Sequence, residues 1–287
     1  LWQSLADSVR DANLSPEKFV DFAIANLAGE SDYNVIRKIA GSLRSSLGYL
    51  DSATEQGIKD YSAKHKEVED LFYQLLSQAD AGSDIQKMWY ARFVSSVESK
   101  ANLTVIEAIL DGKTTFEGLT IDQDKRWNLI AKLNHYQIGN YDERLTAEKA
   151  KDDSDSGIKS AIYAEVLRPD AQTKAKWFDI VVNNPDELKL STLRYIIWGL
   201  FPFGQESLEA PYKDKILAHI TELNAGSDLS KLSAFSSLIP TQCSMESEKE
   251  LAKLVEKYQA MKPQVLKSVK GKHERVGRCV KVLANLT

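Results

Sequence analysis

The chain has 287 residues, 43% of them hydrophobic, and carries 37 Lys and Arg against 41 Asp and Glu, a formal net charge of −4. This content excludes a disordered chain, and the acidic balance gives no general attraction to nucleic acid or to an anionic membrane. Glycine and proline number only 14 and 7, which excludes collagen-like chains and argues against an all-β fold. No apolar run approaches the ~20 residues of a membrane span.

The chain begins at Leu1 rather than at a methionine, and no basic and apolar leader follows. We therefore expect it to be a piece of a longer protein.

Helical periodicity dominates from the beginning of the chain. Apolar residues over 19–27 and 35–47 recur at i, i+3 and i+4, and each run follows a helix-start signal, Ser15-Pro16 and Ser31-Asp32. A long helix is expected over about 52–78. Further helices are expected after Ser83, Asn102, Asp122, Asp155 and Asp170, and then over 187–201, 206–224, 228–239, 246–259 and 261–285.

About fifteen helices with short links predict an all-α fold. The nearest approach to a strand is 115–121, which we expect to be a short extended link. Because helices joined by a few residues pack antiparallel, these pairs predict an α-solenoid, a superhelical HEAT- or armadillo-like array with a concave face. No Pro-, Gly- or Ser-rich linker divides the chain, so we expect a single domain over 1–287.

No catalytic or metal-binding motif is present in the sequence. The zinc-hydrolase pattern H-E-x-x-H fails after His273-Glu274, because Gly277 stands where the second histidine would bind. The nucleophile elbow, the phosphate loop and the dinucleotide pattern are absent. We therefore expect no catalytic residue, no cofactor and no metal in this chain.

Cysteine is scarce. Cys243 and Cys279 could pair, but free thiols are favoured. So few cysteines fit a cytoplasmic protein, although export of the parent protein stays open.

A cluster of polar residues between 122 and 155 holds the first candidate site. Asp122 and Asp124 alternate like the acids of a calcium loop, but the required glycine and final glutamate are missing, so we expect Asp122 to cap a helix and Asp124 to lie in its first turn. Arg126 can fold back on Asp122 or reach Asp155, which predicts a structural clamp; a substrate contact or a cavity lining is the alternative. The stretch 143–160 is expected to be solvated. Four tryptophans are expected in the core: Trp89, Trp127, Trp177 and Trp198.

The last helix is basic, with seven Lys and Arg between Lys262 and Lys281. It has no aromatic residue of the kind that nucleic-acid binding uses for stacking. Two interpretations stay open: the helix pairs with acidic neighbours, or it faces substrate and attracts the carboxylate end of a peptide through Lys270, Arg275 and Arg278.

Several short motifs follow one another in the order and spacing of a known family. They are Leu1-Trp2 with Arg10-Asp11, Gly82 to Gln86 with Trp89 to Arg92, Leu110-Asp111-Gly112, Glu117 to Trp127, Asp153 to Gly157, Arg168 to Ala171 and Lys174 to Trp177. The chain resembles the C-terminal helical domain of aminopeptidase-N-type zinc aminopeptidases, in its bacterial form, a domain also called endoplasmic-reticulum-aminopeptidase-like.

The resemblance implies that zinc and catalysis belong to domains that precede this one in the parent protein. The helical domain then caps the active site, its movement controls the access of peptides, and its partners are the parent's N-terminal catalytic domains and peptide substrates. No catalytic residue of the family matches a position in this chain. The alternative from a different class is a free-standing α-solenoid adaptor that binds a protein or peptide segment.

Overall fold

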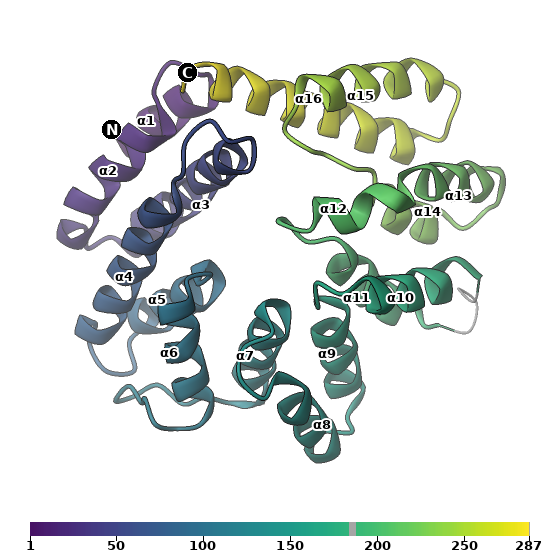
Figure 1. Ribbon diagram of the computed structural model, residues 1–287. Coiled ribbons are helices and arrows are strands. Elements are labelled where there is room, and N and C mark those ends of the chain that lie inside the picture. Colours follow the sequence, from purple (N-terminus) through teal and green to yellow (C-terminus); the bar gives the residue numbers. More distant parts are fainter. Residues whose placement is uncertain (184–187, 287) are drawn as a thin grey trace. The chain divides into compact units, whose positions relative to one another are not determined.

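The computed structural model describes residues 1–183 and 188–286, which form an array of helices (Figure 1). In these residues there is no strand, and one isolated antiparallel bridge joins Phe116 and Leu119, within the extended link expected over 115–121. The predicted all-α fold is confirmed. Across the same residues, no helix combines the length and the hydrophobicity that a bilayer crossing requires.

The chain divides into two compact units, one formed by residues 1–122 together with those from Gly277 onward, the other by Gln123–Val276. The single domain expected over 1–287 stays a prediction.

The first unit is built from helices that pack in sequence order. Helix α2 lies against α3 and α4, and α4 against α5. Three of these helices have a side-chain cap at the amino-terminal end. Asp32 caps α3 by accepting from Asn34 N and Val35 N, and Ser83 and Ser99 cap α5 and α6 by accepting from backbone amides. The helices are α1 (Trp2–Arg10), α2 (Pro16–Asn26), α3 (Tyr33–Glu55), α4 (Ser62–Gln78), α5 (Asp84–Ser96) and α6 (Lys100–Leu110), with a 3-10 turn at Leu27–Gly29.

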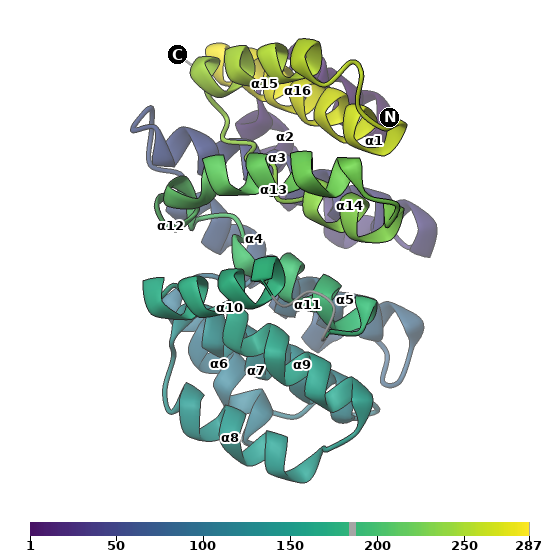
Figure 2. The ribbon, with the colours of Figure 1, turned by 90° about the vertical axis from the view of Figure 1, so that its right-hand side faces the viewer.

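The second unit continues the same pattern. Helix α9 packs against α7, α8, α10 and α11, and α13 lies beside α14 (Figure 2). The helices are α7 (Gln123–Tyr136), α8 (Tyr141–Lys151), α9 (Asp155–Val166), α10 (Ala171–Asn183), α11 (Leu190–Leu200), α12 (Glu206–Glu209), α13 (Lys213–Ala225), α14 (Leu229–Ser236), α15 (Met245–Lys257) and α16 (Pro263–Ala284), of which α16 runs on into the first unit.

Most expected helices are observed, but the long helix expected over about 52–78 is wrong at its start, because α3 ends at Glu55 and α4 begins only at Ser62. Helix α8 was not among the expected helices. The helix expected over 206–224 is interrupted by a 3-10 turn at Ala210–Tyr212, because Pro211 has no amide hydrogen for an α-helical bond. The helix expected over 187–201 is α11; residue 187 lies outside the described residues.

A close approach of two glycines fixes the link after α6 to the start of α5. Gly118 has a φ of +75°, and a Cβ there would lie 2.3 Å from Gly82 N, so no other residue fits. Gln86 completes the junction, because its side chain accepts from Gly82 N at 2.8 Å and donates to Glu117 O at 3.0 Å.

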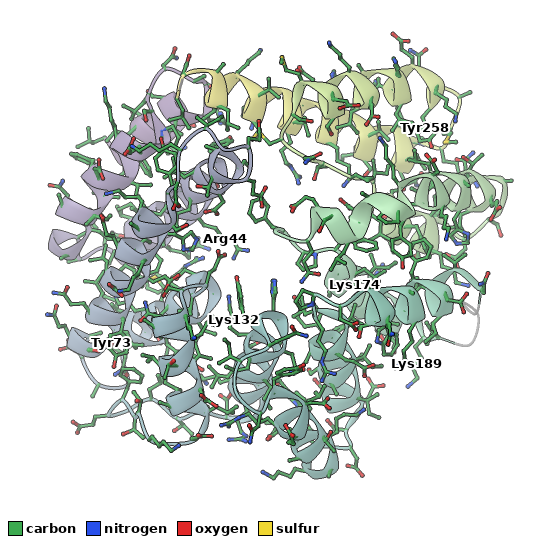
Figure 3. The ribbon with its side chains drawn as sticks, in the orientation of Figure 1. Arg44, Tyr73, Lys132, Lys174, Lys189 and Tyr258 are labelled. Atoms are coloured by element: carbon green, nitrogen blue, oxygen red, sulfur yellow. The ribbon has the colours of Figure 1, made fainter. Side chains whose placement is uncertain are left out.

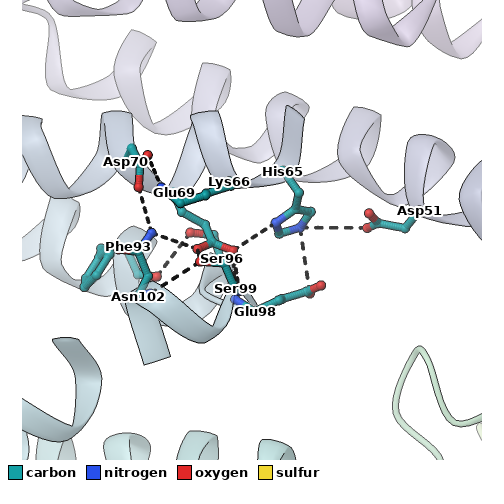
Figure 4. Close-up of polar contacts among 10 residues, drawn as sticks. All are labelled: Asp51, His65, Lys66, Glu69, Asp70, Phe93, Ser96, Glu98, Ser99 and Asn102. Atoms are coloured by element: carbon teal, nitrogen blue, oxygen red, sulfur yellow. Dashed lines mark hydrogen bonds and ion pairs between the residues drawn. The ribbon is translucent and has the colours of Figure 1, made fainter. Parts of the chain in front are cut away.

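A buried carboxylate, Glu69 of α4, holds the link between α5 and α6 (Figure 4). Its side chain is 1% exposed and accepts from the backbone amides of Glu98 and Ser99 at 2.9 and 3.0 Å, from the Ser99 hydroxyl, and from Asn102 Nδ2 at 2.9 Å. Burial alone would raise the pKa of Glu69, but the hydrogen bonds from His65, Ser99 and Asn102 outweigh it and lower the pKa to about 2.

The imidazole of His65 continues this cluster toward α3. Its Nδ1 lies 3.2 Å from Glu69 Oε1, and its Nε2 lies 3.9 Å from Asp51 Oδ2 and 3.8 Å from Glu98 Oε1. Burial would lower the pKa of His65, but the contact with Glu69 and the charges of Glu98 and Asp51 raise it. Burial raises the pKa of Asp51 to about 7. The cluster therefore links α3, α4 and the start of α6.

The expectation of free thiols is wrong. Cys243 and Cys279 are both disulfide-bonded, and the described part of the chain has no free cysteine. The number of residues between two cysteines in a sequence does not show how close their thiols lie in the folded chain. Because disulfides persist mainly in oxidising compartments, the cysteine count no longer supports the expected cytoplasmic location.

Replacing Glu69 by Gln should lower the free energy of unfolding by about 2–4 kcal/mol, because an amide nitrogen would face groups that donate hydrogen bonds. The folded pKa of Glu69 is about 2 against an ordinary value of 4.5. Its stabilisation is therefore complete above pH ~4.5 and is lost as the pH falls toward 2, so the difference between wild type and variant should shrink over that range. Urea denaturation at pH 7, 4 and 3 measures this difference in the free energy of unfolding.

The control is Glu67→Gln, on the exposed side of the same helix. Equal losses of stability in the two variants would contradict the stabilising role of Glu69.

Candidate functional site

Arg126 of α7 forms a two-pronged ion pair with Glu148 of α8. Its Nε lies 2.8 Å from Glu148 Oε1 and its Nη2 2.6 Å from Oε2, while Gln123 Nε2 donates to Oε1 at 2.9 Å. The Glu148 side chain is 3% exposed, so the expectation that all of 143–160 is solvated is wrong at this residue. The hydrogen bond from Arg126 lowers the pKa of Glu148. Arg126 thus joins two helices through a partner that the sequence interpretation did not name.

Trp127 lies in the core, as expected, and its indole ties α7 to the start of α9. The indole Nε1 donates to Asp152 Oδ2 at 2.7 Å, and the Ser154 hydroxyl donates to Asp152 Oδ1 at 2.6 Å. A Cβ at Gly157 would lie 2.4 Å from Asp152 Cγ, so this turn requires glycine. Ser154 caps α9 by accepting from Gly157 N.

The acidic candidates occupy three different positions. Asp122 directly precedes α7, and Asp124 lies exposed in its first turn. Asp155 is the first residue of α9 and forms ion pairs with Lys159 at 2.7 Å and Lys189 at 3.1 Å. Asp155 is therefore engaged by lysines, and Arg126 pairs with Glu148.

Lys174 of α10 is fully buried and bonds to the ends of two neighbouring helices (Figure 3). Its Nζ donates to Val166 O, at the end of α9, at 2.6 Å and to Gly199 O, near the end of α11, at 3.3 Å. Burial lowers the pKa of Lys174 to about 7. The sequence signal was available but not used: Lys174 precedes Trp177 and Phe178 by three and four residues, which puts it on their apolar stripe.

Two lysines of the basic C-terminal segment, Lys262 directly before α16 and Lys272 within it, bond to backbone carbonyls in the same way. Lys262 Nζ donates to Asn224 O at 2.7 Å and to Gly226 O, beyond the end of α13. Lys272 Nζ donates to Ser237 O at 2.9 Å and Ile239 O at 2.7 Å, beyond the end of α14, and burial lowers its pKa to about 8. The contacts are with backbone carbonyls rather than with the expected acidic side chains.

The three residues of α16 proposed to face substrate differ in exposure. Lys270 and Arg275 are exposed, whereas Arg278 is half-buried and lines a small cavity. Their role toward a peptide stays a prediction.

A group of aromatic side chains, of which Trp198 is exposed and Tyr163 and Tyr195 are half-buried, was missed by the sequence interpretation. Trp198 is 59% exposed, so its expected place in the core is wrong. Its ring centre lies 5.6 Å from that of Tyr195, which lies 6.2 Å from that of Tyr163 on α9, and Lys159 Nζ lies 5.9 Å from the centre of the Tyr195 ring. We call Tyr163, Tyr195 and Trp198 the aromatic strip.

Among residues 1–183 and 188–286, no group of three or more His, Cys, Asp and Glu side chains is placed to hold a metal ion. The contacts around Arg126, Trp127 and Lys174 join helix to helix.

These contacts fall on the short motifs noted in the sequence, and a comparison with known families covers the same residues. Residues 1–277 match the family described as the ERAP1-like C-terminal domain. The chain belongs to this family. It is also 26% identical over 215 residues to Aminopeptidase N of Streptomyces lividans, a match that covers 75% of the chain and 24% of that protein. This ERAP1-like domain therefore spans about a quarter of the length of its relative, and the family expected from the motifs is confirmed.

Replacing Arg126 by Ala should lower the free energy of unfolding of this ERAP1-like domain by about 2–4 kcal/mol. The change leaves the buried Glu148 carboxylate without its cation, which costs about 3–5 kcal/mol in a fully buried pair and less here because Arg126 is partly exposed. Arg126→Lys should recover only part of the loss, because an ammonium cannot form the two-pronged contact. Urea denaturation measures all variants, with the exposed Arg194→Ala as control. A stability equal to wild type in Arg126→Ala would rule out the clamp.

Proposed function

We propose that this chain is the non-catalytic cap of a zinc aminopeptidase of the aminopeptidase N type, which controls the access of peptides to an active site encoded elsewhere in the parent. The observation that carries the proposal is the family match over residues 1–277, together with the similarity to Aminopeptidase N. The parent enzyme removes amino-terminal residues from peptides.

The contacts between helix ends support a role in shaping a chamber. The contacts of Arg126 with Glu148 and of Lys174 with Val166 fix neighbouring helices against each other. Small shifts between successive helix pairs still allow a helical array to open or close. A closed chamber excludes large substrates and bulk water, which strengthens the electrostatic interactions at a reacting centre.

The partners of the cap are then the parent's own N-terminal catalytic domains and the peptide substrate. The zinc belongs to the catalytic domain. This chain offers no matching ligand set, because the only His-Glu pair, His273-Glu274, is followed by Gly277 at the position of the second ligand.

A second candidate function is a free-standing adaptor that binds a polypeptide segment. The aromatic strip favours it, because Trp198 is exposed and aromatic side chains are enriched at binding surfaces. The sequence upstream of Leu1 separates the two functions. An H-E-x-x-H motif about 250–500 residues earlier, a spacing expected from ordinary domain sizes, supports the cap, and a start codon just before Leu1 supports the adaptor.

The cap should affect long substrates more than short ones. We expect a parent enzyme truncated before Leu1 to change its kcat/KM for a peptide of about ten residues by at least about tenfold relative to its kcat/KM for a chromogenic aminoacyl amide. Adding this chain in trans should restore part of the difference. The measurement is steady-state hydrolysis of both substrates by the three preparations. Equal changes in kcat/KM for both substrates would refute the gating role.

A further inference from the structure

An open cavity lies within the second unit, between α10 and α13, which lie one above the other in Figure 2. Its volume is about 600 Å³, which is in the range of ordinary ligand cavities. One wall comes from α10, and the other comes from α13 and the 3-10 turn directly before it. None of the residues discussed above as helix-joining contacts lines it.

Aromatic rings form one part of the lining. The ring centre of Phe178, on α10, lies 4.6 Å from that of Tyr212, and the ring centre of Phe201 lies 5.3 Å from that of Tyr212 on another side. Tyr212 is half-buried and lines the cavity. This part of the cavity therefore offers apolar surface to the stem of a long side chain.

The charges of the lining favour a cation. Asp179 of α10 and Glu222 of α13 place an exposed carboxylate on each wall. Asp179 accepts from Asn183 Nδ2 at 2.6 Å, and among the described residues neither carboxylate has a Lys or Arg partner. With Lys215, whose Nζ lies 5.6 Å from the centre of the Tyr212 ring, the lining carries two carboxylates and one ammonium group.

The imidazole of His219 is the observation that points to a ligand. His219 is 8% exposed and lines the cavity, and its ring centre lies 4.5 Å from that of Phe235 on α14. Its Nδ1 lies 3.2 Å from Glu222 Oε2. Its Nε2 is buried and has no hydrogen-bond partner in the described part of the chain. Buried polar groups are rarely left in this state unless a ligand or water satisfies them.

The contacts of His219 show which kind of partner is missing. A carboxylate only accepts hydrogen bonds, so the contact with Glu222 places the ring hydrogen on Nδ1. The other nitrogen, Nε2, is then an acceptor that lacks a donor. The polar groups on both walls thus call for a ligand with N–H donors and a positive charge.

We propose that this cavity binds an arginine side chain of a polypeptide segment, with its guanidinium group between Asp179 and Glu222. A guanidinium has five N–H donors in one plane, so it can bond to carboxylates on two walls and keep a donor for the His219 nitrogen. The stem and the planar group pack against the aromatic ring of Tyr212. An anion would meet two carboxylates, and a purely apolar group would leave the acceptors without donors. The proposal does not depend on the cap function.

Titration of the 287-residue chain with a pair of matched peptides tests the site. The probe is a short peptide with blocked ends and a central arginine, and its control carries citrulline at the same position, which keeps the shape but not the charge. Calorimetry at constant ionic strength measures both, because salt screens charged surfaces. We expect saturable one-to-one binding of the arginine peptide and at least about tenfold weaker binding of the citrulline peptide. No saturable binding of the arginine peptide, or equal affinity for both peptides, would overturn the proposal.

Variants separate the site from a general attraction to an acidic chain. Asp179→Asn and Glu222→Gln each remove one charge and should weaken binding of the arginine peptide by at least about fivefold. His219→Phe keeps a ring against Phe235 but removes the free nitrogen, and it should weaken binding by at least about threefold. Asp214→Asn, exposed on α13 outside the cavity, should leave the affinity unchanged.

Circular dichroism and the melting temperature without peptide confirm that each variant is folded. Equal weakening by Asp214→Asn and Glu222→Gln would overturn the proposal, because it would show binding to surface charge alone.

Discussion

Hydrogen bonds from side chains to the ends of neighbouring helices hold this fold in register. Each helix end leaves backbone groups without an intrahelical partner, and in an array with short links many of these ends are buried by the next helix. Lys174 donates hydrogen bonds to carbonyls at two such helix ends, and Lys272 donates to carbonyls of the segment just after α14. Glu69 plays the corresponding part at the start of α6, where it accepts from backbone amides. A buried helix end without such a partner would lose about 1–3 kcal/mol for each unsatisfied group.

The motifs by which the chain resembles its family coincide with these contacts. Gln86, Arg126, Trp127 and Lys174 all lie in those motifs, and each one joins separate elements of the fold. These motif residues therefore build a helical scaffold, which supports the proposal that the chemistry of the parent protein belongs to another domain.

Local signals predicted most of the helices, because the periodicity of apolar residues and the capping residues lie within each segment. They missed the break between α3 and α4 and the polar helix α8. The partners were harder to predict. Glu148 lies 22 residues after Arg126, in the next helix, and nothing in its own segment marks it as buried. Trp198 sits among apolar residues of α11 yet is exposed, because Leu193, Ile196, Ile197 and Leu200 already fill the buried side of that helix. Long-range pairing and the choice of helix face depend on neighbouring helices, which a single sequence does not specify.

The central claim is that this polypeptide shapes access to a reaction that it does not perform. The most direct measurement incubates the purified chain with Zn²⁺, removes unbound metal, and assays the release of amino-terminal residues from a peptide. The account predicts no release above the blank and less than stoichiometric zinc in the purified chain. Release that depends on zinc and stops on chelation would contradict it.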